Sequence, residues 1–133
     1  MNVFIVEDSE IVSDELKAMF SEIPGINVVG HAVSERGAIE QIGAMRPDVV
    51  VLDIALRPGS GINVLRVIKK CNPAIKFIVL TNYTDEMYVN NCMSAGAEYF
   101  FDKSLEFMRV GAVLRQLLAT DGLDDKRIAL HKQ

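Results

Sequence analysis

The sequence predicts an α/β protein in which helices cover both faces of a parallel sheet. Five apolar runs alternate with five segments of helical spacing, which is the pattern of a parallel sheet built from right-handed crossovers. The run Val49-Val50-Val51-Leu52 is apolar throughout and indicates an inner strand that is buried on both faces. It leads to Asp53, at the carboxyl end of the strand, where sheets of this kind bind ligands.

Each predicted strand is a short run rich in apolar residues. The five runs are residues 3–6, 26–31, 49–52, 75–81 and 98–102. The last contains Tyr99-Phe100-Phe101, in which strand alternation places Phe100 on the face opposite Tyr99 and Phe101.

The predicted helices lie between residues that can cap a helix and residues that end one. Residues 34–45 form the second helix, and the expected caps of the other four are Ser9, Ser60, Thr84 and Ser104. The expected ends are Pro24-Gly25, Pro47, Pro73, Gly96 and Asp121-Gly122. Lys69 and Lys70 close the third helix, where positive charge suits the helix dipole.

Composition limits the classes of function. The chain has 133 residues, of which 50% are hydrophobic and 24% charged, so it is expected to fold as one domain with its own core. Its net charge of -4 argues against direct binding of nucleic acid, and no apolar run approaches membrane-spanning length. Cys71 and Cys92 suggest neither a zinc site nor a disulfide framework. A cytoplasmic location is therefore expected.

Polar side chains follow four of the five predicted strands. Glu7 and Asp8 follow the first, Asp53 the third, Thr81 the fourth and Lys103 the fifth. Each has a simpler explanation by itself, such as an N-cap for Asp8 or a solvated lysine for Lys103. Because the carboxyl ends of parallel strands share one edge, coincidence is a weaker explanation than a common site.

Three neighbouring carboxylates repel one another unless a cation lies among them. Ligands that are all oxygen indicate Mg²⁺ or Mn²⁺ rather than zinc. Thr81 and Lys103 are then placed to serve a phosphoryl group, and Asp53 to act as the nucleophile that becomes an aspartyl phosphate. His31 and His131 are expected to be bystanders.

The ordered set Glu7-Asp8, Asp53, Thr81 and Lys103 resembles the receiver domain of two-component response regulators. The resemblance implies a flavodoxin-like, doubly wound (βα)5 fold with a five-stranded parallel sheet of order 2-1-3-4-5. It implies a receiver domain over residues 1–120 of the stand-alone type. Residues 121–133 are then a short C-terminal tail without an output domain.

The resemblance also implies a role for each site residue. Glu7, Asp8, Asp53 and the backbone carbonyl of Ala55 would bind Mg²⁺, and Asp53 would accept phosphate from a phosphohistidine. Two further roles concern the response to phosphate. The Thr81 hydroxyl would bond the phosphoryl group while Lys103 balances its charge, and Phe100 would turn inward as the switch aromatic.

Two residues depart from the family pattern. Ser104 stands where the family usually has a proline in a cis bond, and Phe100 stands where a tyrosine is more common. An inward Phe100 therefore has to be held by burial rather than by a phenolic hydrogen bond.

The expected function is that of a phosphoacceptor in signal transduction and not of an enzyme with a separate substrate. The expected partners are a histidine kinase or a histidine phosphotransfer protein, and an unidentified downstream protein. That protein would bind the face of the fourth helix, fifth strand and fifth helix, where Met87, Tyr88, Asn91 and Tyr99 are candidate contacts. Phosphorylation-linked homodimerisation is one form that this output can take.

Three alternatives remain at this point. The chain can be a receiver fragment of a longer DNA-binding transcription regulator, with residues 121–133 as the start of a linker. A Mg²⁺-dependent phosphatase is disfavoured because residues 54–58 read Ile-Ala-Leu-Arg-Pro, without a second carboxylate. A flavin-binding protein of the same topology is disfavoured because acids follow the first strand.

Overall fold

We describe a computed structural model of the chain. It describes residues 1–56 and 58–131, with the backbone alone for residues 122–131. The elements are β1 (Asn2–Val6), α1 (Glu10–Ser21), β2 (Asn27–Ala32), α2 (Glu35–Met45), β3 (Val49–Leu52), α3 (Gly61–Cys71), β4 (Lys76–Thr81), α4 (Glu86–Ser94), β5 (Tyr99–Asp102) and α5 (Arg109–His131).

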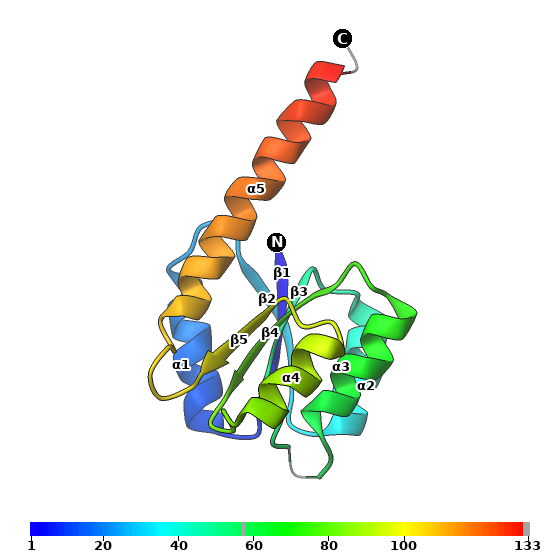
Figure 1. The fold of residues 1–133 in the computed structure, drawn as a ribbon. Helices are drawn as coiled ribbons and strands as arrows, with labels where there is room; N and C mark the ends of the chain where they lie inside the picture. Colours follow the sequence, from blue (N-terminus) through cyan, green and yellow to red (C-terminus); the bar gives the residue numbers. More distant parts are fainter. Residues whose placement is uncertain (57, 132–133) are drawn as a thin grey trace.

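The five strands form one parallel sheet in the order β2-β1-β3-β4-β5 (Figure 1). This confirms the parallel sheet that the alternation of strands and helices predicted, and the doubly wound, flavodoxin-like strand order that the family resemblance implied. The inner strands β1, β3 and β4 have completely buried side chains from Val3 to Val6, from Val49 to Leu52 and from Phe77 to Thr81. Their near-continuous apolar sequences are therefore explained by cover on both faces.

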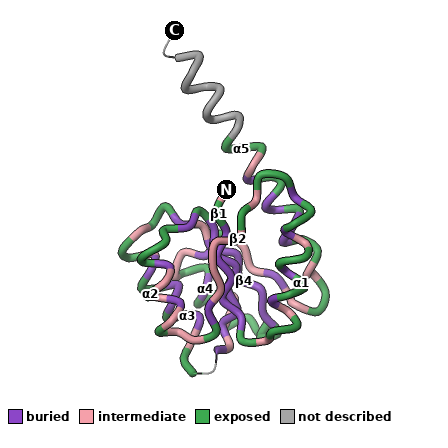
Figure 2. Tube along the Cα trace, turned by 180° about the vertical axis from the view of Figure 1, so that it is seen from behind, coloured by how far each residue is buried: buried purple, intermediate pink, exposed green. Residues whose placement is uncertain are grey.

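Each face of the sheet has its own core. Along β1, Val3 and Ile5 pack with α1 and α5, whereas Phe4 and Val6 pack with α2, α3 and α4. Figures 1 and 2 show these two helical layers with the buried strands between them. Strand alternation also places Phe100 in the core on the α2–α4 side and its two aromatic neighbours in the other core, as predicted.

Two helices begin later than the sequence predicted. Thr84 does not cap α4: Asp85 holds the N-cap position with extended dihedral angles (φ -59°, ψ 147°), so the helix begins one residue further on. Ser104 does not cap α5, which begins at Arg109. The carboxylate of Asp102 instead accepts the backbone N–H groups of Ser104 at 2.8 Å and Leu105 at 3.1 Å, and this delays the helix.

The last helix is longer than the sequence predicted. It does not end at Asp121-Gly122 but continues to His131, and it rises away from the sheet in Figure 1. A single glycine inside a helix costs only ~1 kcal/mol relative to alanine, so Gly122 does not by itself end the helix. The proposed tail therefore begins within α5, while residues 132–133 and the side chain of His131 lie outside the described residues.

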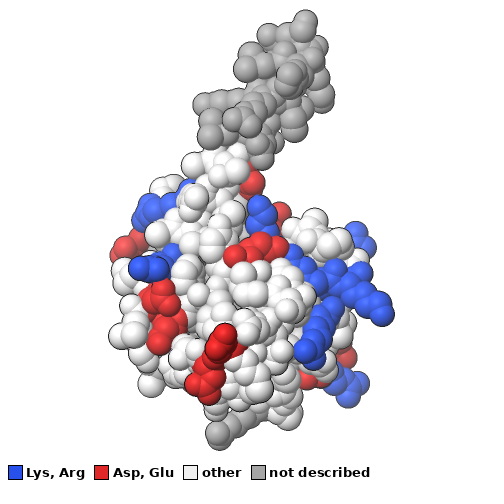
Figure 3. Space-filling model, in the orientation of Figure 1, with Lys and Arg blue, Asp and Glu red and all other residues white. Residues whose placement is uncertain are grey.

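Charge is distributed unevenly over the surface. Figure 3 shows cationic side chains gathered on the flank of α3, whose last turn carries Lys69 and Lys70. Their positions match the negative end of the helix dipole, as predicted. Within the described residues, every helix is too short or too polar to cross a membrane.

Candidate functional site

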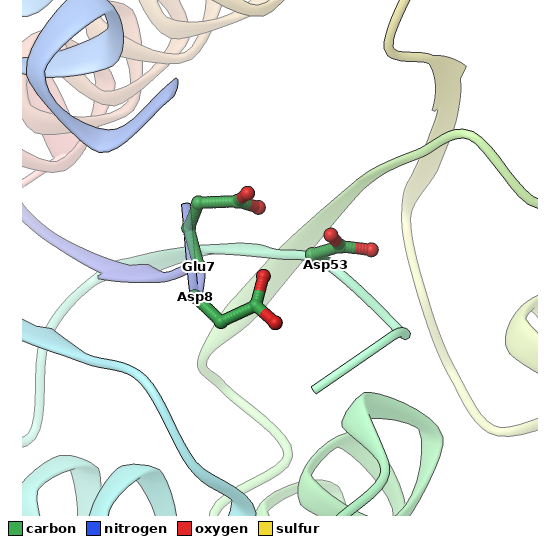
Figure 4. A group of neighbouring side chains, drawn as sticks. All are labelled: Glu7, Asp8 and Asp53. Atoms are coloured by element: carbon green, nitrogen blue, oxygen red, sulfur yellow. The ribbon is translucent and has the colours of Figure 1, made fainter. Parts of the chain in front are cut away.

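Three acidic side chains meet at the carboxyl edge of the sheet. Glu7 and Asp8 directly follow β1, and Asp53 directly follows β3, which is hydrogen-bonded to β1. Figure 4 shows the side chains of Glu7 and Asp8 extending toward Asp53, and a ligand oxygen from each of the three acids lies within 4.8 Å of the others. Glu7 is 3% exposed and Asp53 6%, whereas Asp8 is exposed. The parallel register of two neighbouring strands thus brings residues from distant parts of the chain together.

Lys103 lies between two of these acids. Its Nζ donates to both carboxylate oxygens of Glu7 at 3.0 Å and to Oδ2 of Asp53 at 2.8 Å. The backbone N–H of Lys103 donates to the carbonyl of Thr81 at 2.9 Å, which fixes where the lysine leaves β5. The ammonium group partly balances two carboxylates that burial removes from water.

The site holds more negative charge than one lysine neutralises. Burial, and then the charge of Asp53, raise the pKa of Glu7 from its ordinary 4.5 to about 7, although Lys103 opposes the shift. Burial alone lowers the pKa of Lys103, but its hydrogen bonds and charge interactions with Asp53 and Glu7 raise it overall. A second cation near the three acids would therefore be stabilised.

Hydrogen bonds and close packing fix the backbone around Asp53. The N–H of Asp53 donates to the carbonyl of Val6 at 2.9 Å, and the N–H of Ala55 donates to Oδ1 of Asp53 at 3.1 Å. At Gly61, the first residue of α3, an added Cβ would lie 2.1 Å from the carbonyl oxygen of Asp53. Glycine is required there because α3 begins against the backbone of the acid.

The acids line an open cleft of about 660 Å³. Tyr83 and Tyr88 also line it, with ring centroids 5.5 Å apart in an edge-to-face arrangement. The lining comprises Glu7, Asp8, Ser9, Val12, Asp53, Ile54, Ala55, Leu56, Ser60, Ile62, Asn82, Tyr83, Tyr88 and Lys103.

The sequence model described as the response regulator receiver domain matches residues 3–115. The chain belongs to this family. It is 33% identical over 129 residues to the DNA-binding transcriptional activator DevR/DosR of Mycobacterium tuberculosis, with 97% of this chain and 59% of that protein covered. It is 35% identical over 105 residues to a protein-glutamate methylesterase/protein-glutamine glutaminase of Alkalilimnicola ehrlichii, with 77% and 27% covered. The chain therefore spans less than two thirds of either relative.

Solved receiver structures resemble the whole fold. The response regulator domain of Thermotoga maritima CheB is 28% identical with a TM-score of 0.78, and the match covers 90% of this chain and 94% of that one. A chain in the CheX-CheY-BeF3-Mg complex of Borrelia burgdorferi is 27% identical with a TM-score of 0.74, covering 86% and 89%. Each match covers most of both chains.

Thr81 and Phe100 do not line the cleft that holds the acids of this receiver domain. Thr81 is fully buried and does not line the cleft; its Oγ1 accepts the backbone N–H of Tyr83 at 3.2 Å. Phe100 is half-buried and lines a separate cavity of about 350 Å³ with Val89 of α4 and Leu105. The structure thus brings together Glu7, Asp8, Asp53 and Lys103, whereas neither Thr81 nor Phe100 is among the residues that line their cleft.

Two contacts at the site escaped the sequence analysis. His31, which the sequence analysis expected to be a bystander, contacts the site, because its Nε2–H donates to the backbone carbonyl of Glu7 at 2.9 Å. The signal for this contact lies in the sheet order, since β2 pairs with β1 and His31 lies opposite Ile5. In addition, the Ser104 hydroxyl donates to Oδ1 of Asn82 at 3.2 Å and so joins the loops after β4 and β5.

The donor set of the receiver domain suits a hard divalent cation. Carboxylate oxygens come from Glu7, Asp8 and Asp53, and Ala55 lines the same cleft. Mg²⁺ prefers a few such oxygens and completes its shell with water or phosphate. The raised pKa of Glu7 gives an independent sign that the described acids lack sufficient positive charge.

Proposed function

We propose that this receiver domain accepts a phosphoryl group on Asp53 from a phosphohistidine of a histidine kinase or a histidine phosphotransfer protein. The observation that carries the proposal is the Lys103 ammonium, 2.8 Å from the Asp53 carboxylate inside a cluster of acids. A largely buried lysine beside a strand-end aspartate supports phosphoryl transfer because it balances the charge that such a group adds.

The transfer involves two displacements at phosphorus. A carboxylate oxygen of Asp53 attacks the phosphorus, the P–N bond of the phosphohistidine breaks, and the released imidazole takes up a proton from solvent. Later, water attacks the phosphorus, the bond to the Asp53 oxygen breaks, and inorganic phosphate leaves as a water proton passes to solvent. The protein thereby catalyses its own phosphorylation and slow dephosphorylation without acting on a separate substrate.

Glu7, Asp8, Asp53 and the Ala55 carbonyl would hold Mg²⁺ or Mn²⁺ beside the acceptor. When bound, the ion supplies charge neutralisation for the phosphoryl oxygens in the transition state. Lys103 contributes positive charge to the same oxygens. Its two acidic partners orient its ammonium before a donor arrives.

Thr81 and Phe100 would form the switch. The Thr81 hydroxyl faces the backbone of Tyr83 and has to move to reach a phosphoryl group on Asp53. Such a movement would change the loop before α4, beside the cavity that Phe100 lines. Phosphate would then shift a two-state equilibrium on the face of α4, β5 and α5, where Met87 is 60% exposed.

The output would be an altered contact with another protein, with homodimerisation as one form. A structural relative in a complex of CheX with CheY supports a protein partner. A second candidate is specifically favoured by the similarity to a DNA-binding transcriptional activator, of which the chain covers 59%. In that case residues 1–120 are the receiver of a longer regulator, and residues 121–133 lead toward its output domain. The length of the coding sequence decides between the two candidates.

The test of the acceptor chemistry is incubation with acetyl phosphate, followed by intact mass measurement. Wild type is expected to gain one phosphate in the presence of Mg²⁺ and none with a chelator. Asp53→Asn is expected to gain none while keeping its fold, because an amide cannot act as the nucleophile. An adduct that persists in Asp53→Asn, or none in wild type under conditions that modify a known receiver, would contradict the proposal.

A further inference from the structure

Glu35, the first residue of α2, contacts the loop between β3 and α3. Its Oε1 accepts the backbone N–H of Ser60 at 2.9 Å, and its Oε2 accepts the side-chain N–H of Asn63 at 3.2 Å. The backbone N–H of Glu35 donates to the carbonyl of Pro58 at 3.3 Å. These three hydrogen bonds attach the start of α2 to the end of the β3–α3 loop and to the first turn of α3, more than twenty residues away.

The start of α3 depends on this carboxylate. Ser60 holds the N-cap position, but its side chain makes no capping bond, and the first turn of α3 contains no acidic residue. A helix N-terminus carries unpaired N–H groups and partial positive charge. Glu35 supplies both the acceptor and the negative charge from the neighbouring helix.

The loop is shaped to admit Glu35. Gly59 has a φ of +109°, and a Cβ at this position would lie 2.4 Å from the Cβ of Glu35. A side chain there would displace Glu35, so only glycine fits both the backbone conformation and the approach.

The contact continues to the phosphoacceptor. Ser60 pairs with Ala55 in an isolated antiparallel bridge, and the N–H of Ala55 donates to Oδ1 of Asp53 at 3.1 Å. Glu35 is therefore linked to Asp53 through Ser60 and Ala55. The carbonyl of Ala55 is also one of the four proposed Mg²⁺ ligands.

We propose that Glu35 is a positioning residue of the phosphorylation site, which holds the β3–α3 loop so that the Ala55 carbonyl and the Asp53 carboxylate are arranged for Mg²⁺. The inference rests on the proposed function. Partners that orient metal ligands typically change metal affinity by 10- to 100-fold when they are removed. Glu35→Ala is therefore expected to weaken Mg²⁺ binding by about tenfold.

The deciding measurement is the Mg²⁺ affinity of the unphosphorylated protein by calorimetry. Glu40→Ala is the matched control, because Glu40 lies further along α2 and pairs with Arg36 at the surface, 3.2 Å apart. Glu40→Ala is expected to bind Mg²⁺ as wild type does. In Glu35→Ala, phosphorylation by acetyl phosphate is expected to need more Mg²⁺ for half-maximal rate and to recover at saturating Mg²⁺. If Glu35 served stability alone, Glu35→Ala would lower the melting temperature but leave the Mg²⁺ concentration for half-maximal phosphorylation unchanged.

Equal Mg²⁺ affinity in folded Glu35→Ala and Glu40→Ala would overturn the inference. If Glu35→Ala does not fold, Glu35→Gln decides, because glutamine keeps the shape but loses the charge and turns an N–H2 toward a donor. Unchanged affinity in that variant overturns the inference equally. The wild-type protein distinguishes failure of the proposed function from failure of the Glu35 inference. If wild type neither binds Mg²⁺ nor gains phosphate on Asp53, the proposed function fails together with the inference.

Discussion

Lys103 Nζ lies 2.8 Å from Oδ2 of Asp53 although fifty residues separate them. The contact arises because β3, β4 and β5 are consecutive parallel strands of the sheet. The residues that follow β3 and β5 therefore emerge at the same edge, and the long lysine side chain reaches across the end of β4. The lysine side chain is 12% exposed and the aspartate side chain 6%. Burial costs both charges most of their hydration, and the ion pair between them offsets part of that cost.

Removal of the Lys103 charge is expected to destabilise the fold at neutral pH. Lys103→Met keeps most of the apolar stem but leaves the carboxylates of Glu7 and Asp53 unpaired, at a cost of about 3 kcal/mol in unfolding free energy. The loss of unfolding free energy should be smaller at pH 5.5, where Glu7 is protonated and carries no negative charge. It should also be smaller in the presence of Mg²⁺, whose charge would replace that of the lysine. Urea unfolding measures both effects. Lys70→Met, at an exposed position, is the control, and an equal loss in the two variants would contradict the prediction.

Glu7 is expected to make the metal-free protein less stable as the pH rises. Its pKa is about 7 in the fold and about 4.5 when unfolded, so the fold binds an extra proton between these values. The corresponding stability is present in full below pH 4.5 and is lost as the pH rises through 7, by about 3 kcal/mol. Glu7→Gln does not titrate, so the wild-type unfolding free energy should fall relative to the variant across this range. Parallel curves in a chelator would contradict the prediction.

Gly61 and Gly43 are expected to respond oppositely to alanine. In Gly61→Ala the Cβ would meet the Asp53 carbonyl at 2.1 Å, which should cost about 1 to 3 kcal/mol and disturb phosphorylation. In Gly43→Ala no atom outside the neighbouring backbone of α2 lies within 4 Å of the new Cβ, and the helix should gain about 0.5 to 1 kcal/mol. Thermal unfolding of both variants checks the signs. A stable, fully phosphorylated Gly61→Ala protein would show that the backbone of Asp53 can shift.

Tyr83 is expected to shield the aspartyl phosphate from water. It is 48% exposed, lines the cleft, and is supported by the ring of Tyr88. Tyr83→Ala should open the cleft and shorten the phosphate half-life several-fold. Met87→Ala, which changes an exposed α4 residue outside the cleft lining, should leave the half-life unchanged. A time course of dephosphorylation measures this, and an unaltered decay in Tyr83→Ala would exclude shielding.

Several features of the site were predictable because they depend on strand ends alone. In a parallel sheet, every residue that follows a strand emerges at the same edge, so Glu7, Asp8, Asp53 and Lys103 could be assigned to one site. Their roles in phosphoryl transfer remain predictions. The burial of Thr81 was not predictable, because the path of the loop after β4 decides whether its hydroxyl faces the cleft.

Helix ends were predicted less well, because neighbouring side chains compete for the backbone N–H groups at the start of a helix. Ser104 and Thr84 have suitable side chains, but Asp102 binds the backbone N–H of Ser104, and Asp85 remains extended. Sequence patterns name residues that can cap, whereas the neighbouring turn decides which residue does. Gly122 is a parallel case, since glycine permits a helix end without requiring one.

The alternation of strands and helices, the parallel sheet and the acids at its edge were predictable from the residues alone, because apolar periodicity and strand polarity are local properties of the chain. Two contacts became visible only in the folded chain: His31 bonds the backbone of Glu7, and Glu35 accepts the backbone N–H of Ser60 at the start of α3. Both contacts join residues about 25 positions apart through side chains that have no distinctive local pattern. Such contacts follow from how strands and helices pack against one another, which the spacing of residues along the chain does not record.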